Sequence, residues 1–216
     1  MCPDKKKRQN DMKKCLIVSG GEFEKIEGNA VYDLIIACDR GYERCVKNGI
    51  VPDVVIGDFD SYGGKIDDKI EVIKLNPIKD DTDTMSAVRY AIDNGCKEIR
   101  ICCAFGGRFD HSMANIQTAS FILENGAAPI ITGKDTIVYG IKNSEITLPK
   151  KEDCYISFFA LSDVCEGVTI KGTKYLMDNG VITNTFPIGV SNEWTGDEAH
   201  IAVKSGTAVI IISKFM

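Results

Sequence analysis

Five short apolar runs, separated by polar or helix-like segments, dominate the first two thirds of this 216-residue chain. They lie at residues 15–18, 34–38, 54–56, 72–75 and 99–104. Continuous apolar runs of this length, rather than alternating ones, are typical of strands buried on both faces of a parallel sheet. The chain is therefore predicted to begin with a Rossmann-like α/β domain whose parallel sheet is covered by helices.

Two helices are expected among these strands, at residues 82–92 and 111–125. Thr82 or Asp83 can cap the first helix and Asp110 the second, because Thr and Asp side chains accept hydrogen bonds from the free N–H groups of a first helical turn. Both helices would pack against the predicted sheet.

The pattern changes after about residue 139, where short strand-like runs separated by turn residues replace the helical periods. The runs lie at residues 155–160, 167–171, 181–182, 200–203 and 208–213. Strands at intervals of about 8–12 residues are typical of a small antiparallel sandwich or barrel. We therefore expect two domains, an α/β domain over residues 12–140 and an antiparallel β-sandwich domain over residues 141–216.

The composition excludes several classes of protein. A formal net charge of −5 argues against nucleic-acid binding, which usually needs a basic face. No apolar run approaches the roughly 18 residues of a membrane-spanning helix, and the basic N-terminus lacks the apolar stretch of a signal peptide. The nine cysteines are scattered and form no C-x-x-C pair, which is typical of free thiols in a reducing compartment. We expect a cytoplasmic protein that binds neither membrane nor nucleic acid.

Acidic side chains stand where the predicted strands end. Asp39 follows the second strand, Asp58 and Asp60 follow the third, Asp83 begins the helix after the fourth, and Asp110 follows the fifth. The carboxyl ends of parallel strands meet at one edge of a sheet, where ligands of such folds bind. Carboxylates at such an edge hold magnesium together with substrate phosphates. An extended backbone would also point Asp58 and Asp60 the same way.

Two further segments carry candidate binding groups. In GGRFDH, at residues 106–111, Arg108 offers donors suited to phosphate, and His111 lies at a predicted helix N-terminus that favours anions. His111 is equally well explained as a structural cap, and the chain contains no Walker A loop. The only tryptophan, Trp194, lies beside small polar residues. It is either an aromatic platform for a ligand or a residue of the sandwich core.

Several of these segments resemble, in order and spacing, the thiamine pyrophosphokinase family. They are DRG (39–41), PDVVIGDFDS (52–61), KDDTD (79–83) and GRFDHSMAN (107–115). The later segments GVTIKG (167–172) and SNE (191–193) are similar to that family's thiamine-binding domain. The resemblance spans about residues 14–213. It departs from the family at Arg40, where a smaller residue is often found.

The resemblance implies transfer of a pyrophosphoryl group from ATP to thiamine, with Mg²⁺ as cofactor, giving thiamine diphosphate and AMP. It also implies a homodimer whose active site lies between the catalytic domain of one subunit and the sandwich of the other. The implied catalytic residues are Asp58, Asp60 and Asp83, which also bind the metal together with Asp39. The implied nucleotide-binding residues are Asp39, Arg108, Asp110, His111 and Asn115, and the implied thiamine-binding residues are Ser191, Asn192 and Trp194.

Two alternatives remain open from the residues alone. A metal-dependent phosphohydrolase would use the same carboxylates to activate water. A non-catalytic thiamine sensor would keep both domains but form no AMP.

Overall fold

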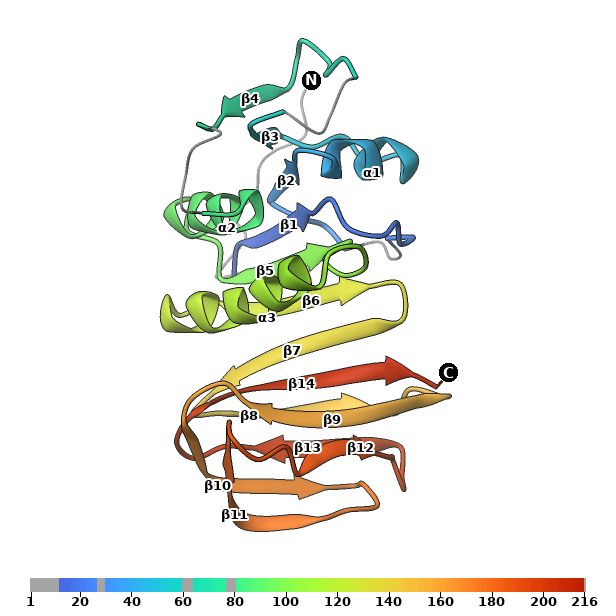
Figure 1. Cartoon of the computed structure of the whole chain (residues 1–216), viewed down its shortest axis with the longest axis vertical. Coiled ribbons are helices and arrows are strands. Elements are labelled where there is room, and N and C mark those ends of the chain that lie inside the picture. Colours follow the sequence, from blue (N-terminus) through green and yellow to red (C-terminus); the bar gives the residue numbers. More distant parts are fainter. Residues whose placement is uncertain (1–11, 27–29, 60–63, 77–80, 216) are drawn as a thin grey trace, which may run out of the picture.

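A computed structural model describes residues 12–26, 30–59, 64–76 and 81–215. The strands form one ten-stranded sheet, whose strands follow one another along the long axis of the molecule, and one four-stranded sheet that packs against one end of it (Figure 1). Three helices accompany them, namely α1 (Gly41–Lys47), α2 (Asp83–Asp93) and α3 (Phe109–Glu124). Within the described ranges, no helix has both the length and the apolar character needed to cross a membrane.

Six neighbouring strands of the large sheet are parallel. In spatial order they are β6 (Ala128–Gly133), β5 (Glu98–Cys102), β1 (Lys14–Val18), β2 (Leu34–Cys38), β3 (Val54–Gly57) and β4 (Glu71–Lys74). Five of them fall on the predicted apolar runs, which confirms the predicted parallel sheet.

The remaining strands are antiparallel. The large sheet continues from β6 through β7 (Thr136–Lys142), β14 (Thr207–Lys214), β9 (Cys154–Ala160) and β12 (Gly189–Asn192). The second sheet contains β11 (Met177–Thr183), β10 (Val164–Lys171), β13 (Glu198–Ala202) and β8 (Glu145–Pro149). Buried residues from both sheets, such as Phe158, Ile210 and Ile201, form one apolar core. The predicted antiparallel sandwich is therefore confirmed.

The large sheet runs without a break across the predicted domain boundary. Strand β7 contains residues 140 and 141, and it pairs with β6 on one side and with β14 on the other. One half of the sandwich is thus a hydrogen-bonded extension of the parallel sheet. The division into residues 12–140 and 141–216 stays a prediction.

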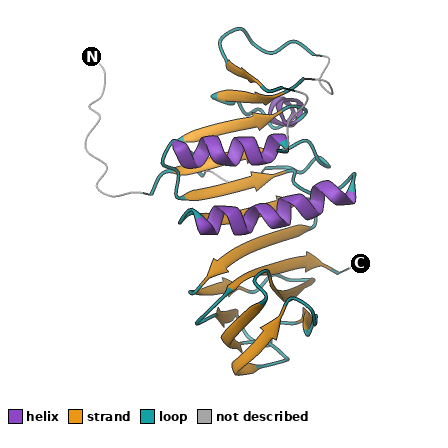
Figure 2. Cartoon of the chain, turned by 60° about the vertical axis from the view of Figure 1, so that its left-hand side comes forward, coloured by secondary structure: helices purple, strands orange, loops and turns teal. Residues whose placement is uncertain are grey.

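The two faces of the parallel strands are covered differently. Helices α2 and α3 lie across one face (Figure 2), where Ile17 and Ile101 are fully buried. Leu16 and Val18 point to the opposite face, since side chains alternate along a strand, and they pack with Tyr42 of α1. The sheet is therefore buried on both faces here, as its continuous apolar strands require.

One of the two predicted helix caps is confirmed and the other is wrong. Thr82 caps α2, because its Oγ1 accepts a hydrogen bond from the backbone N–H of Met85 at 3.1 Å. Asp110 does not cap α3, because that helix starts at Phe109 and its N-cap position is occupied by Arg108. Asp110 instead lies in the first turn, where the helix dipole stabilises a negatively charged side chain.

Gly41, the first residue of α1, occupies a position with no room for a side chain. A Cβ atom there would lie 1.9 Å from the carbonyl oxygen of Val18, a backbone atom of β1. We expect Gly41→Ala to lower the free energy of unfolding by about 2 kcal/mol or more, because the added methyl group forces the helix away from the sheet. Urea denaturation followed by circular dichroism measures the change.

Gly196→Ala is the matched control, because a Cβ atom at Gly196 would meet nothing within 4 Å. Its free energy of unfolding should stay within about 0.5 kcal/mol of the parent protein. Equal stability of the Gly41→Ala protein would contradict the close packing of α1 against β1.

Candidate active site

The ends of β2 and β3 bring Asp39 and Asp58 to one edge of the sheet. Asp39 directly follows β2, and its N–H donates to the carbonyl of Ile56 at 3.0 Å. Gly57 allows this close approach, because a Cβ atom there would lie 3.0 Å from the Cβ of Asp39. Asp58 is the next residue, and the two acidic positions therefore lie on adjacent strand ends.

Asp83 reaches the same edge from the first turn of α2. The thiol of Cys38, the last residue of β2, donates to the carbonyl of Asp83 at 3.7 Å. Burial raises the pKa of this thiol, and the negative charges of Asp83 and, more weakly, Asp39 raise it further. Asp83 therefore begins α2 beside the end of β2, the strand that Asp39 follows.

A buried hydroxyl pair fixes α2 at this edge. Ser19 directly follows β1, and its Oγ lies 2.9 Å from the Oγ1 of Thr84 in a buried hydrogen bond. The bond ties the end of β1 to the turn that carries Asp83. Sequence reasoning did not assign a role to either residue. The sequence did contain one signal for such a role, because Ser19 is a polar residue immediately after an apolar run.

The predicted extended backbone between Asp58 and Asp60 is wrong. Phe59 has φ of 61°, which is a left-handed conformation that breaks the alternation of side chains along a strand. Phe59 does pack against the apolar cluster that contains Val55, as expected for its side chain. Asp60 itself lies outside the described residues, so its predicted catalytic and metal-binding roles stay predictions.

The carboxylates at this edge have the oxygen donors that magnesium prefers. Three of the four predicted ligands, Asp39, Asp58 and Asp83, are in the described part of the chain and follow or adjoin neighbouring strand ends. In that part, no three acidic, histidine or cysteine side chains are close enough together to hold a metal ion by themselves. A complete ligand set therefore requires a further donor, such as Asp60 or a substrate phosphate.

Arg108 and His111 lie on the surface at the start of α3. The guanidinium of Arg108 binds Asp110, with Nε donating to Oδ1 at 3.1 Å. This hydrogen bond, followed by weaker contributions that include the N–H of His111, lowers the pKa of the Asp110 carboxyl group. The described arrangement is an exposed ion pair, which an incoming phosphate can open at little cost.

The side chain of Asn115 is buried and hydrogen-bonded within the fold. It is 6% exposed, and its Nδ2 donates to the carbonyl of Ala104 at 2.6 Å. The amide therefore holds the segment after β5 against α3. The predicted contact of Asn115 with a nucleotide stays a prediction.

Asn192 and Trp194 are likewise buried in the sandwich. The side chain of Asn192 accepts from the N–H of Tyr175 and donates to the hydroxyl of Thr173 and to the carbonyl of Tyr175. Trp194 is 9% exposed, belongs to the sandwich core and donates to the carbonyl of Leu148. Its ring does not form the expected platform, and of the three predicted thiamine-binding residues only Ser191 is exposed.

Comparison with known proteins assigns this architecture to one family. Residues 28–130 match the family model described as "Thiamin pyrophosphokinase, catalytic domain". Residues 143–208 match the model described as "Thiamin pyrophosphokinase, vitamin B1 binding domain". The two matches follow each other along the chain and together span well over half of it.

Individual relatives agree with the family models. The chain is 29% identical over 214 residues to thiamine pyrophosphokinase of Bacillus subtilis, covering 94% of this chain and 99% of the relative. The crystal structure of thiamine pyrophosphokinase from Bacillus subtilis matches with a TM-score of 0.84 at 26% identity, covering 94% and 100% of the two chains. Thiamin pyrophosphokinase from Candida albicans shares the fold, with a TM-score of 0.72 at 16% identity over 94% and 89% of the chains.

The N–H groups of the buried side-chain amide of Asn192 should contribute measurably to the free energy of unfolding. We expect Asn192→Asp to lower the free energy of unfolding by about 2–4 kcal/mol, because aspartate offers no N–H to Thr173 and Tyr175 and adds a buried charge. Urea denaturation at pH 7 measures the loss.

The control is the same substitution at Asn179, which is exposed and accepts a hydrogen bond from Lys204 Nζ at 2.7 Å. Asn179→Asp keeps that acceptor, so its free energy of unfolding should change by less than about 0.5 kcal/mol. If the two variants were equally stable, the buried amide of Asn192 would not be holding its segment in place.

Proposed function

The chain is an enzyme of the thiamin pyrophosphokinase family, and from this premise we propose that it transfers a pyrophosphoryl group from ATP to thiamine. The products are thiamine diphosphate and AMP. The observation that supports the proposal is the position of Asp39, Asp58 and Asp83, which follow β2, follow β3 and begin α2 beside the end of β2, at the carboxyl edge of the parallel sheet. Ligands of open α/β sheets bind at this edge.

The reaction makes one bond and breaks one bond. The hydroxyl oxygen of thiamine attacks the β-phosphorus of ATP, and the bond from that phosphorus to the oxygen bridging toward the α-phosphorus breaks. AMP departs with the bridging oxygen, and the hydroxyl proton passes to a carboxylate or to water. Such a transfer depends mainly on positioning and on neutralising phosphate charge.

Magnesium fits this site as the proposed cofactor, since all the described donors are carboxylates. When bound, it supplies positive charge next to the phosphate oxygens. Asp39, Asp58 and Asp83 would hold it, and Asp60 has the same proposed role from the sequence. One of these carboxylates also accepts the alcohol proton in our proposal.

The start of α3 provides the remaining contacts to the nucleotide in this proposal. Arg108 exchanges Asp110 for a phosphate of ATP, which restores the paired charge that the guanidinium has in the described arrangement. His111 adds a second donor near the same helix N-terminus, where anions are favoured. Asn115 contributes by holding the preceding segment through Ala104.

Thiamine binds, in our proposal, at the exposed surface around Ser191. The side chains of Tyr175, Phe186, Ile188 and Val190 are large, apolar and between 46% and 66% exposed. Tyr175 lies against Asn192, through which it is joined to the Ser191 segment. Exposed apolar side chains gathered on one segment are typical of a binding or subunit interface.

The same surface supports the proposed homodimer. An active site shared between subunits would place the Ser191 segment of one subunit over the carboxylates of the other. Asn192 and Trp194 then act from within the sandwich, by fixing the segment that carries the contacts. We also propose a cytoplasmic location, because all eight cysteines in the described part of the chain are free thiols, as expected in a reducing compartment.

Product analysis tests the proposed reaction. Mass spectrometry after mixing protein, ATP, magnesium and thiamine should detect thiamine diphosphate and AMP in equal amounts. Omission of any one component should remove both products. Phosphate release without thiamine would instead indicate a phosphohydrolase, and thiamine binding without AMP would indicate a sensor.

Asp60→Asn should abolish turnover in the same assay while the melting temperature stays near that of the parent protein. Asp93→Asn is the matched control, because Asp93 is exposed at the far end of α2 from Asp83. That control should retain full activity. Near-normal turnover of Asp60→Asn would remove this carboxylate from the mechanism.

Mixed subunits test whether the active site is shared. We expect Asp58→Asn and Ser191→Arg each to be inactive alone, because each damages a different half of the site. Randomly mixed dimers should recover about a quarter of the parent activity, since half are heterodimers with one intact site. The two proteins are refolded together and assayed against each refolded alone.

If dimers shown to contain one subunit of each variant recovered no activity, both halves of the site would lie within one subunit. Full activity of a parent protein that gel filtration with light scattering shows to be monomeric would exclude the dimer.

A further inference from the structure

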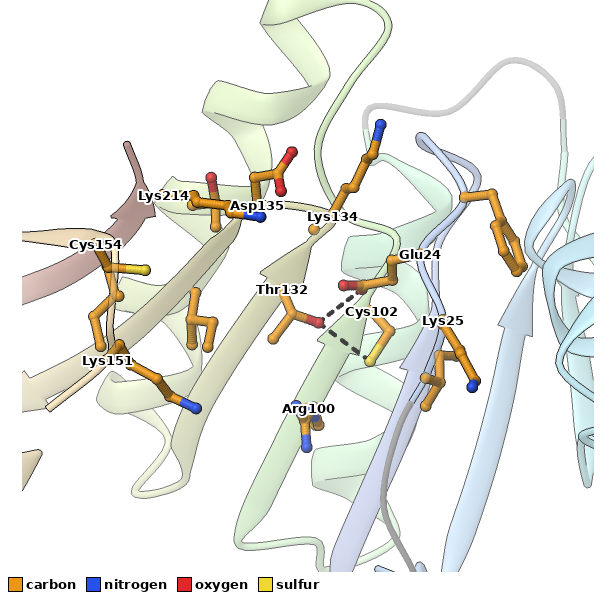
Figure 3. Close-up of a pocket in the computed structure, with 16 residues that line it drawn as sticks. Glu24, Lys25, Arg100, Cys102, Thr132, Lys134, Asp135, Lys151, Cys154 and Lys214 are labelled. Carbon is orange, nitrogen blue, oxygen red and sulfur yellow. Dashed lines mark hydrogen bonds between the residues drawn. The ribbon is translucent and has the colours of Figure 1, made fainter. Parts of the chain in front are cut away.

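The face of the large sheet that carries α1 has an uncovered stretch before the sandwich begins. A cavity of about 740 Å³ lies there (Figure 3). Its floor is formed by side chains of four adjacent strands, β5, β6, β7 and β14: Arg100, Cys102, Thr132, Ile137 and Ile212. One wall is the segment after β1, at residues 23–26, and the other contains Lys151, Cys154 and Lys214.

The lining of this cavity is strongly cationic. Two carboxylates, Glu24 and Asp135, face five cationic side chains, which are Lys25, Arg100, Lys134, Lys151 and Lys214. The formal surplus of three positive charges stands in a chain whose net charge is −5. The cavity is therefore locally cationic in a chain that is acidic overall.

The carboxylate of Glu24 is held in place by hydrogen bonds within the fold. Its Oε1 accepts from the backbone N–H of Cys103 at 2.6 Å. It also accepts from the hydroxyl of Thr132 at 2.7 Å (Figure 3). Lys134 has only a long contact, 3.5 Å, with Glu22. Lys25, Lys151 and Lys214 form no ion pair with any described residue.

Arg100 extends the positive charge to the floor. Its side chain is partly buried, and its Nε atom is buried without a hydrogen-bond partner among the described residues. A buried donor without a partner costs free energy. An anion bound over the floor would pair with the guanidinium charge of Arg100 and would also neutralise the lysines of both walls.

We propose that this cavity binds a small molecule that carries two or more phosphate groups. Two phosphate groups bring a charge that matches the surplus of the lining, and Arg and Lys are the side chains that recognise them. The volume lies in the usual range for small-molecule sites, roughly 300–1,000 Å³. The apolar side chains Phe23, Ile26, Ile137 and Ile212 would pack against an organic part of the ligand.

The site is separate from the candidate active site, because the cavity is lined by none of the predicted catalytic, nucleotide-binding or thiamine-binding residues. The segment after β1 nevertheless reaches both places. Ser19, at its start, bonds Thr84 beside Asp83, and Glu24 lies in the wall of the cavity.

Calorimetric titration with inorganic pyrophosphate tests this proposal on the full chain. The titration contains EDTA and neither nucleotide nor thiamine, so binding does not depend on metal or on turnover. Lys151→Ala/Lys214→Ala, from one wall, and Lys25→Ala/Lys134→Ala, from the other, should each weaken binding by about tenfold or more. Two independent pairs keep the test decisive if one variant fails to fold.

The matched control is Lys97→Ala/Lys171→Ala, which removes the same charge from two exposed lysines outside the cavity. It should bind pyrophosphate as the parent protein does. The proposal is overturned if the parent protein does not bind, if the cavity variants bind normally, or if the control weakens binding as much as they do.

Discussion

The register between β2 and β3 is the constraint on which the candidate site depends. The N–H of Asp39 continues the ladder beyond β2 by donating to Ile56, and Gly57 leaves the space for that approach. A shift of one residue would turn one of the two acidic side chains to the other face of the sheet. Parallel pairing and one residue without a side chain thus bring acidic groups together that are distant in the sequence.

Polar groups inside the fold keep these loops in place. The hydroxyl pair of Ser19 and Thr84 joins β1 to α2, Asn115 holds the segment after β5, and Asn192 holds the segment around Tyr175. Each is buried and hydrogen-bonded, as buried polar groups need to be. Small polar residues near the candidate site therefore support its loops, and in the proposed function their exposed neighbours contact the ligand.

Much of the fold could be predicted from the sequence, because buried parallel strands and capped helices leave strong patterns. The five apolar runs, the cap at Thr82 and the change to antiparallel strands all follow from such patterns. Strand β6 was missed because it contains Pro129, which argues against an interior strand. Strand β12 was missed because it is short and irregular, with Ser191 at φ of 57°.

The details of the site were harder to predict, because they depend on tertiary packing. The left-handed backbone at Phe59 has no local signal, since glycine is the residue that normally adopts it. The burial of Trp194 against Leu148 depends on two strands that are distant in the sequence. The order of the acidic residues along the chain was sufficient to find the edge of the sheet, but not the direction of each side chain.

The unbroken hydrogen-bond ladder through β7 has a mechanical consequence. A crevice between two lobes usually closes by bending at a flexible connection, but here the lobes share one stiff ribbon of strands. Bending at that place would break pairs on both sides of β7. Opening and closing around a substrate must therefore come from the loops at the sheet edge or, in the proposed homodimer, from movement of one subunit against the other.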